Sequence, residues 1–316
     1  MDQQAVSVGG QEIAYRASDG TGKAVIFVHG NSSSARTWQG LLDSPFGQRY
    51  RCLALDLPGH GQSPPNSDQA AYSIPGYVEV LTGFATALDA ADAVIVGWSL
   101  GGHIAIEAAP ALPGAAGFVV FGTPPVSSAE QLATAFQPNP AMNVGFTAAV
   151  SPEEARAYAA SFVTPGSTPS LDEFVADVLA TDGAARAGLM TSIGEGRFGD
   201  QVGLAATLGR PLAVLQGEGE QLVSLDYLQT LTIPTLWRGA VQIVPGAGHA
   251  LHQETPRGLR RPARGLHRRP RLATQPPPPD GLAPAGSWAG AARSWARRGP
   301  GRWGPGRWGP GRRSPG

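Results

Sequence analysis

Short continuous runs of apolar residues alternate along the chain with stretches of helical spacing. The runs have the length of buried strands, and helical patterns lie between some of them. Strands that alternate with helices predict right-handed crossovers and a mostly parallel sheet, and thus an α/β fold. Residues 5–16 alternate instead around Gly9-Gly10, which predicts a hairpin. The predicted strands are 24–28, 52–55, 93–96, 118–121, 212–215 and 241–244, and the predicted helices are 75–88 and 101–109.

The pattern changes between about Val126 and Leu208. Alanine-rich helical stretches, broken by five prolines, replace the strand runs there. We therefore expect a helical lid at 126–208, inserted between two parts of an α/β core at 1–125 and 209–256.

Residues 257–316 differ in composition from the rest. They contain 14 arginines and one acid, four consecutive prolines and a repeated Gly-Pro-Gly-Arg-Trp unit, with few aliphatic residues. Such a segment buries too little apolar surface to offset its ordering entropy, so this tail is predicted to be disordered.

Charge and hydropathy limit the classes of binding partner and the cellular location that we expect. Residues 1–256 carry 23 acidic and 10 basic side chains, which favours solubility over nucleic-acid binding. The chain begins without a signal-peptide pattern and has no apolar run of about 18 residues, so we expect a cytoplasmic protein with no membrane partner. The single cysteine, Cys52, lies in an apolar run and is interpreted as a packed strand residue.

Gly97-Trp98-Ser99-Leu100-Gly101 matches the G-x-S-x-G nucleophile elbow, in which a serine stands on a sharp turn between a strand and a helix. Three fixed positions are weak alone, and the alternative is an ordinary turn serine. Here a predicted strand precedes the motif and a predicted helix follows it. The sequence therefore predicts Ser99 as a nucleophile.

A serine hydroxyl needs a base, and in this fold an acid and then a histidine follow the serine along the chain. His249 is the downstream histidine that follows a predicted strand and a glycine-rich turn. For the acid, Glu220 and Glu218 compete after strand 212–215, with Asp226 as an outsider. The spacing of the loop favours Glu220, which would orient His249.

An acyl-transfer site also needs donors for the carbonyl oxygen. The N–H of Leu100, directly after the nucleophile, and that of Asn31, in the loop after strand 24–28, are the candidates. His29 and His60 are interpreted as loop-stabilising residues. No cluster has zinc spacing and no Walker or dinucleotide fingerprint occurs, so no metal and no cofactor are expected.

Together these motifs resemble the metal-independent N-acyl-homoserine lactonases of the α/β-hydrolase superfamily, over about residues 10–256. The more particular features are Asn-Ser-Ser-Ser after His-Gly, the Gly-Thr-Pro-Pro-Val run, and a glutamate in the acid position. The runs that carry the resemblance are 28–34, 56–61, 97–103, 122–126 and 246–250.

The resemblance implies further roles. The family uses a glutamate as the acid, in agreement with Glu220, and a lid tyrosine that contacts the substrate carbonyl, a place similar to that of Tyr158. Trp98 is a second candidate substrate contact. Ser99 would attack the lactone carbonyl, and His249 would protonate the departing ring oxygen and then activate water. An apolar channel beneath the lid would hold the acyl chain.

The chain departs from that family after Pro256, where a closing amphipathic helix is expected. A frameshift would explain the arginine-rich sequence. With one choice of codons for residues 257–271, reading one base later gives Glu-Ala-Phe-Asp-Ala-Leu-Leu-Ala-Gly-Phe-Ile-Ala-Asp-Leu, which has apolar residues at helical spacing. Because the codons are chosen, the gene sequence has to decide.

Three functions remain open. The first is a serine hydrolase that opens acyl-homoserine lactones through an acyl-enzyme on Ser99, with the small-molecule lactone as its partner. The second is a carboxylesterase with the same triad, since the lid sets the substrate. The third is a catalytically impaired or ligand-binding homologue.

Overall fold

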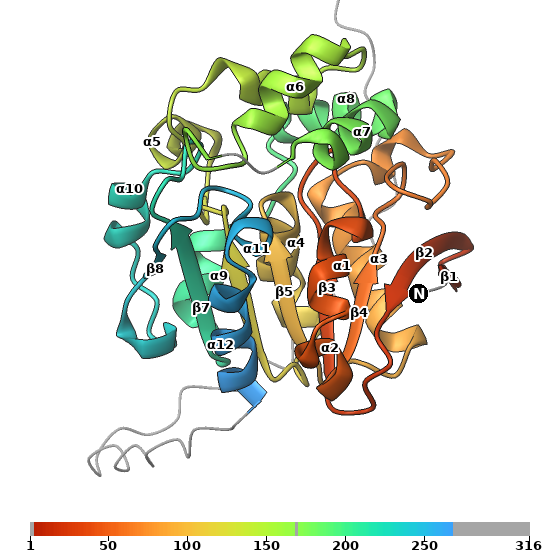
Figure 1. Ribbon diagram of the computed structural model, residues 1–316, viewed down its shortest axis with the longest axis vertical. Helices are drawn as coiled ribbons and strands as arrows, with labels where there is room; N and C mark the ends of the chain where they lie inside the picture. The colour runs from red at the N-terminus through yellow and green to blue at the C-terminus, as the bar shows by residue number, and fades with distance from the viewer. Residues whose placement is uncertain (1–2, 168–169, 268–316) are drawn as a thin grey trace, which may run out of the picture. The chain divides into compact units, whose positions relative to one another are not determined.

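The computed structural model describes residues 3–167 and 170–267, and its described part is built on one mixed sheet (Figure 1). The strand order is β1-β2-β4-β3-β5-β6-β7-β8. The pairs from β4 through β3, β5, β6, β7 and β8 are all parallel, as predicted, whereas β1–β2 and β2–β4 are antiparallel. The strands are β1 (Gln4–Val8), β2 (Gln11–Ala17), β3 (Ala24–Val28), β4 (Arg51–Leu55), β5 (Val94–Trp98), β6 (Gly117–Phe121), β7 (Leu212–Gly217) and β8 (Gln242–Val244).

The predicted hairpin at the beginning of the chain is confirmed. β1 and β2 pair from Val8 opposite Gln11, which leaves Gly9 and Gly10 as the two-residue loop. Both glycines have positive φ, 57° and 85°, the conformation that such a tight turn requires and that glycine adopts without a steric penalty.

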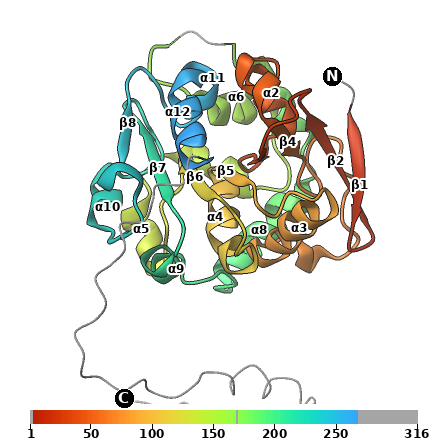
Figure 2. The same cartoon turned by 90° about the horizontal axis from the view of Figure 1, so that it is seen from below.

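Helices cover both faces of the sheet (Figure 2). Successive side chains of a strand point to opposite faces, so Ile26 and Val28 of β3 enter one apolar cluster while Val25 and Phe27 enter the other. The first cluster is completed by α3 (Ile74–Ala87), α4 (Leu100–Ala108), α9 (Gln201–Thr207) and α10 (Leu225–Thr230). The second is completed by α1 (Gln39–Leu42), α2 (Pro45–Arg49), α11 (Leu251–Glu254) and α12 (Pro256–His267).

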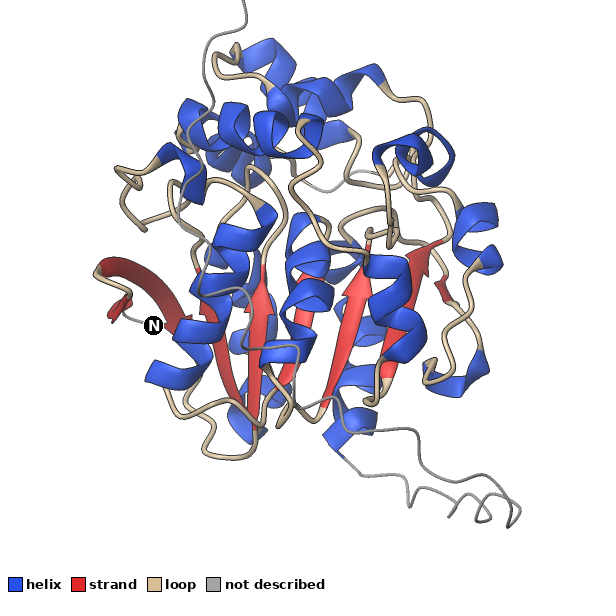
Figure 3. Ribbon diagram, turned by 180° about the vertical axis from the view of Figure 1, so that it is seen from behind, coloured by secondary structure: helices blue, strands red, loops and turns tan. Residues whose placement is uncertain are grey.

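The insertion between β6 and β7 forms a cap of helices beyond the carboxyl ends of the parallel strands (Figures 1 and 3). In its described part every regular element is helical, as predicted, and this edge of an α/β sheet is where ligands usually bind. The cap contains α5 (Leu132–Ala135), the 3₁₀ segment Pro140–Phe146, α6 (Pro152–Ala160), α7 (Asp172–Ala180) and α8 (Gly183–Gly194), whereas α9, the last helix of the insertion, packs on the sheet face.

The buried Arg186 links segments of the cap through hydrogen bonds. Arg186 of α8 is 3 % exposed and donates to three backbone carbonyls, those of Thr147 at 2.7 Å, Ala148 at 2.9 Å and Val178 at 2.9 Å. These acceptors lie before α6 and in α7. The guanidinium therefore links three segments of the lid at one point.

The end of the described chain differs from the prediction of disorder after Pro256. Residues 256–267 form α12, because Leu259, Pro262, Ala263 and Leu266 recur at helical spacing and are buried against the sheet. Arg257, Arg261 and Arg264 of this helix are exposed, and a composition averaged over 60 residues hid this short amphipathic pattern. The proline-rich and Gly-Pro-Gly-Arg-Trp segments of the predicted tail lie outside the described residues. Within residues 3–167 and 170–267, no helix is both long and apolar enough to cross a membrane.

Candidate active site

Ser99 stands on a strained turn between β5 and α4. Its φ of 53° and ψ of −119° are unusual for a residue with a side chain, and such strain is typical of functional turns. The flanking glycines are required sterically. A Cβ on Gly97 would lie 2.3 Å from the carbonyl oxygen of Gly101, and one on Gly101 would lie 2.3 Å from that of Val28. The elbow predicted from the sequence is therefore present.

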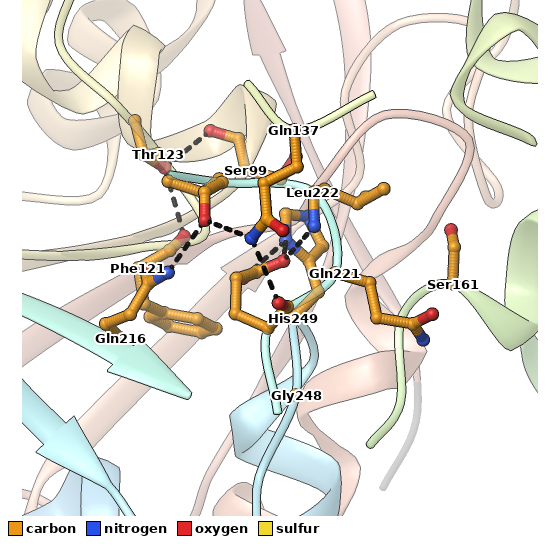
Figure 4. A network of polar contacts seen from close by, with 12 residues as sticks. Ser99, Phe121, Thr123, Gln137, Ser161, Gln216, Gln221, Leu222, Gly248 and His249 are labelled. Carbon is orange, nitrogen blue, oxygen red and sulfur yellow. Dashed lines mark hydrogen bonds and ion pairs between the residues drawn. The ribbon is translucent and has the colours of Figure 1, made fainter. Parts of the chain in front are cut away.

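The loop after β6 supports this turn (Figure 4). The Ser99 N–H donates to the Phe121 carbonyl at 2.9 Å, and the Thr123 hydroxyl donates to the Ser99 carbonyl at 2.9 Å. The sequence analysis gave Thr123 no role, although it singled out the Gly-Thr-Pro-Pro-Val run. That run was the signal that this loop braces the elbow.

His249 and Glu220 are paired at the carboxyl edge of the sheet. His249 Nδ1 lies 2.9 and 3.0 Å from the two carboxylate oxygens, and both side chains are 2 % exposed. Glu220 also accepts the Leu222 N–H at 2.8 Å. The competing Glu218 is exposed and accepts the Gly246 N–H at 3.2 Å instead. The geometry thus favours Glu220 as the acid.

The orientation of the His249 ring follows from its neighbours. An ionised carboxylate only accepts hydrogen bonds, so Nδ1 donates to Glu220 and Nε2 is left as an acceptor. The ring packs beside Trp98 and Phe162, with centroids 5.8 and 5.9 Å apart. On another side it lies against Gly122, where a Cβ would stand 2.5 Å from Cε1.

The loop that carries His249 is bonded to the lid on both sides of the histidine. Ala250 N–H donates to the Phe162 carbonyl at 2.6 Å, and Gly248 N–H donates to Glu254 at 2.7 Å. The Glu254 carboxylate also accepts the Thr164 N–H at 3.0 Å. The sequence analysis missed Glu254, because no local motif marks a carboxylate that joins two loops.

The two predicted oxyanion donors face one cavity. Asn31 and Leu100 both line it together with Ser99 and His249. In the hydrogen bonds found among the described residues, neither the Asn31 nor the Leu100 backbone N–H has an acceptor. The first N–H groups of a helix have no intrahelical partner, so Leu100 at the start of α4 is available to an anionic oxygen.

This cavity has a volume of about 480 Å³, within the usual range of small-molecule sites. Tyr158 of α6 lines it, and burial raises the pKa of its phenol well above the usual value. The Asn31 side chain donates to the Gly145 carbonyl, and a Cβ on Gly145 would lie 2.5 Å from the Tyr158 hydroxyl. The apolar part of the wall is formed by Ile74, Leu132, Phe136, Met142, Phe146, Leu189, Met190, Ile193, Phe198 and Leu222.

Trp98 does not line this cavity, in contrast to its prediction as a substrate contact. It is 1 % exposed and packs behind the histidine, against His249, Phe162 and Phe174. An elbow residue follows the strand into the core, so the side chain before the nucleophile turns away from the cavity. Its contacts make it a support of the His249 ring.

His29 stabilises its loop, as expected. Its Nδ1 donates to the Gly30 carbonyl at 2.8 Å, and its Nε2 accepts the Leu57 N–H at 3.0 Å. Burial lowers the pKa of His29 to about 4, which keeps the ring neutral. His60 bonds the Pro58 carbonyl within its own turn at 3.0 Å. Among the described residues, no group of three or more His, Cys, Asp or Glu side chains is placed to hold a metal ion.

Comparison with solved structures gives a close relative over nearly the whole fold. The N-acyl homoserine lactonase AidH, complexed with N-butanoyl homoserine, matches with a TM-score of 0.80 and 33% sequence identity over 85% of this chain and 99% of AidH. The esterase RhEst1 from Rhodococcus sp. ECU1013 shares the fold at 24% identity and a TM-score of 0.69, covering 84% of this chain. The resemblance to the N-acyl-homoserine lactonases is confirmed.

Curated sequences match over shorter stretches. The uncharacterized protein Rv2715 of Mycobacterium tuberculosis is 36% identical over 107 residues, or 34% of this chain and 30% of the relative. The pimeloyl-[acyl-carrier protein] methyl ester esterase of Methylococcus capsulatus is 35% identical over 111 residues, or 34% of this chain and 40% of the relative. The chain thus spans less than half the length of these curated relatives. The family model described as "Alpha/beta hydrolase family" matches residues 25–263, and the chain belongs to this family of hydrolases.

Proposed function

We propose that this protein is a serine hydrolase that opens the lactone ring of N-acyl-homoserine lactones. The observation that carries the proposal is the cavity in which Ser99, His249, Asn31 and Tyr158 meet beneath the lid, on a fold similar to AidH. AidH has been crystallised with N-butanoyl homoserine and, in a serine-to-glycine variant, with N-hexanoyl homoserine lactone. Those are the product and the substrate of this reaction, and a serine variant that retains lactone agrees with a serine nucleophile.

The proposed reaction is acyl transfer to Ser99 and then to water. His249 Nε2 takes the hydroxyl proton as Ser99 attacks the lactone carbonyl, and Glu220 stabilises the imidazolium through Nδ1. The N–H groups of Leu100 and Asn31 bind the negative oxygen. His249 then protonates the ring oxygen, which leaves as the alcohol of the ring-opened chain. A water deprotonated by His249 releases the acyl-homoserine.

Tyr158 and the apolar wall account for substrate binding. The Tyr158 phenol remains protonated because burial raises its pKa, so it can donate a hydrogen bond to a substrate carbonyl. The Asn31 side chain is already committed to the Gly145 carbonyl, which fixes the loop whose N–H we assign to the oxyanion hole. The acyl chain would lie along the apolar wall of the lid.

Mass spectrometry of an N-acyl-homoserine lactone incubated with the protein tests the proposal. We expect a gain of one water that is reversed by acidification, because a ring-opened hydroxy acid closes again. Ser99→Ala should leave the lactone intact. A lactone that stays unchanged beside rapid cleavage of simple esters would instead establish the second candidate, a carboxylesterase, which the esterase relatives favour. Inactivity on both classes would indicate an impaired homologue.

A further inference from the structure

The cavity contains a polar side chain that the proposed reaction does not use. His103 lies on α4, four residues after Ser99, and lines the same cavity. Its ring is also near Phe136, with centroids 6.4 Å apart, on the apolar side of the cavity. Burying a polar atom without a hydrogen-bond partner costs free energy, so a histidine in an apolar wall is expected to have a partner for each ring nitrogen.

The orientation of Gln201 fixes the proton on His103. Gln201 is fully buried, and its side-chain oxygen lies 3.3 Å from the Val126 N–H, which can only donate. Its amide nitrogen donates to Glu107 at 2.7 Å. The atom that faces Val126 must therefore be the oxygen, because the opposite orientation would place an NH2 group against a second donor and the oxygen against a carboxylate.

The same Gln201 oxygen lies 2.7 Å from His103 Nδ1. Nδ1 must then carry the hydrogen and donate it, and in a neutral ring Nε2 is an acceptor. Burial lowers the pKa of His103 to about 4, so the ring is neutral at pH 7. Among the described residues, no group is hydrogen-bonded to His103 Nε2, and this atom is not fully buried. Because His103 lines the cavity, Nε2 is accessible from it.

We propose that His103 is a specificity-determining residue whose Nε2 accepts a hydrogen bond from a hydroxyl group on the acyl chain of the substrate. The inference rests on the proposed lactonase function and names its preferred substrate class. An acceptor that is fixed in its tautomer cannot donate, so it distinguishes a hydroxyl from a carbonyl at the same place.

The position of His103 favours a group on the acyl chain over the amide of the substrate. Four residues of helix separate its Cα from that of Ser99 by about 6 Å along the axis. The amide nitrogen is two bonds from the carbonyl carbon that Ser99 attacks, whereas a hydroxyl on the third acyl carbon is six bonds away. The longer span matches one turn of helix, and the acyl chain runs along the wall where Phe136 lies.

The test compares N-hexanoyl-, N-(3-hydroxyhexanoyl)- and N-(3-oxohexanoyl)-homoserine lactone. For the wild type we expect kcat/KM to be highest for the hydroxylated chain, and the hydroxy-to-oxo ratio to be about ten or more, since an unpaired acceptor facing the oxo group is unfavourable. The ratio is measured within one protein. It is therefore independent of the fraction of enzyme that is folded and of defects in the shared catalytic steps.

Two variants remove Nε2 in complementary ways. His103→Asn places an amide nitrogen near the position of Nδ1, so the bond to Gln201 can be kept, and His103→Phe keeps the ring but loses both nitrogens. The hydroxy-to-oxo ratio should fall to about one in both. A wild-type ratio near one, or a ratio that survives in both variants, overturns the role of His103 while the lactonase stands. A wild type that opens none of the three lactones overturns the proposed function itself.

Discussion

Gly122→Ala tests whether the loop after β6 sets the position of the catalytic ring. Gly122 has a φ of 59°, and its missing Cβ would lie 2.5 Å from Cε1 and 2.7 Å from Nδ1 of His249. The ring cannot retreat easily, because Glu220 holds Nδ1 and two aromatic rings flank it. A methyl group therefore has to displace the imidazole by a fraction of an ångström to about 1 Å, and errors of that size cost on the order of 100-fold in rate.

Gly9→Ala is the matched control. Gly9 has nearly the same φ, 57°, but no atom lies within 4 Å of its Cβ position, in a hairpin loop between β1 and β2. Both variants should lose about 1 kcal/mol of stability from the left-handed backbone alone, measured by urea unfolding. Only Gly122→Ala should lose about 100-fold in kcat, measured with a lactone and with a simple ester. Equal kcat values for the two variants would refute the steric argument.

Four further outcomes follow from the contacts. Glu254→Gln should lower kcat about tenfold with little change in KM, because in either orientation the amide NH2 group faces the N–H of Thr164 or of Gly248. Glu218→Gln should stay within about twofold of the wild type, and equal losses in the two variants would contradict the link. Arg186→Met should reduce the free energy of unfolding by about 3 kcal/mol, since three lid carbonyls lose their donor, and thermal unfolding that is unchanged would argue against it. Burial raises the pKa of Asp177 to about 6, against an unfolded value near 3.8, so the stabilising contribution of this carboxyl is present below about pH 4 and is lost as the pH rises through 6. The free energy of unfolding of the wild type, relative to that of Asp177→Asn, should therefore fall by on the order of 2 kcal/mol over that range. A difference that stays constant with pH would show that the pKa of the carboxyl is not shifted. Replacing residues 257–267 with Glu-Ala-Phe-Asp-Ala-Leu-Leu-Ala-Gly-Phe-Ile should raise the Tm by several degrees, mainly through loss of the interior proline, and a lower Tm would count against the frameshift.

The strands β3 to β7 were predictable because they are buried on both faces and therefore appear as continuous apolar runs bounded by turns. The elbow that carries Ser99 was predictable for a different reason. The elbow needs small residues at Gly97 and Gly101 to avoid backbone oxygens, so its geometry is written into five consecutive positions. Chain order and loop spacing then identified His249 and Glu220, whose side chains the structure brings to 2.9 Å.

Residues that act through long-range partners were not predictable from local patterns. Glu254 bonds Thr164, which is 90 positions away, and His103 bonds Gln201, which is 98 positions away. Such pairs depend on how the irregular lid folds back over the sheet. The prediction of Trp98 as a substrate contact was wrong, because the alternation of the strand turns its side chain into the core and away from the cavity.

In α12, four buried positions at helical spacing are enough for the chain to form a closing helix against the sheet. Its buried positions are 259, 262, 263 and 266, and the alternative reading frame places Phe, Leu, Leu and Phe at those four positions. The present chain fills them with leucines, an alanine and a proline, and it leaves Arg260 Nε buried without a partner among the described residues. Pro262 also removes one helix hydrogen bond. Packing against the sheet requires buried side chains at helical spacing, and the present chain meets this requirement although Pro262 and Arg260 fit a buried helix poorly. We expect this poor fit to lower the stability, and the exchange of residues 257–267 would measure by how much.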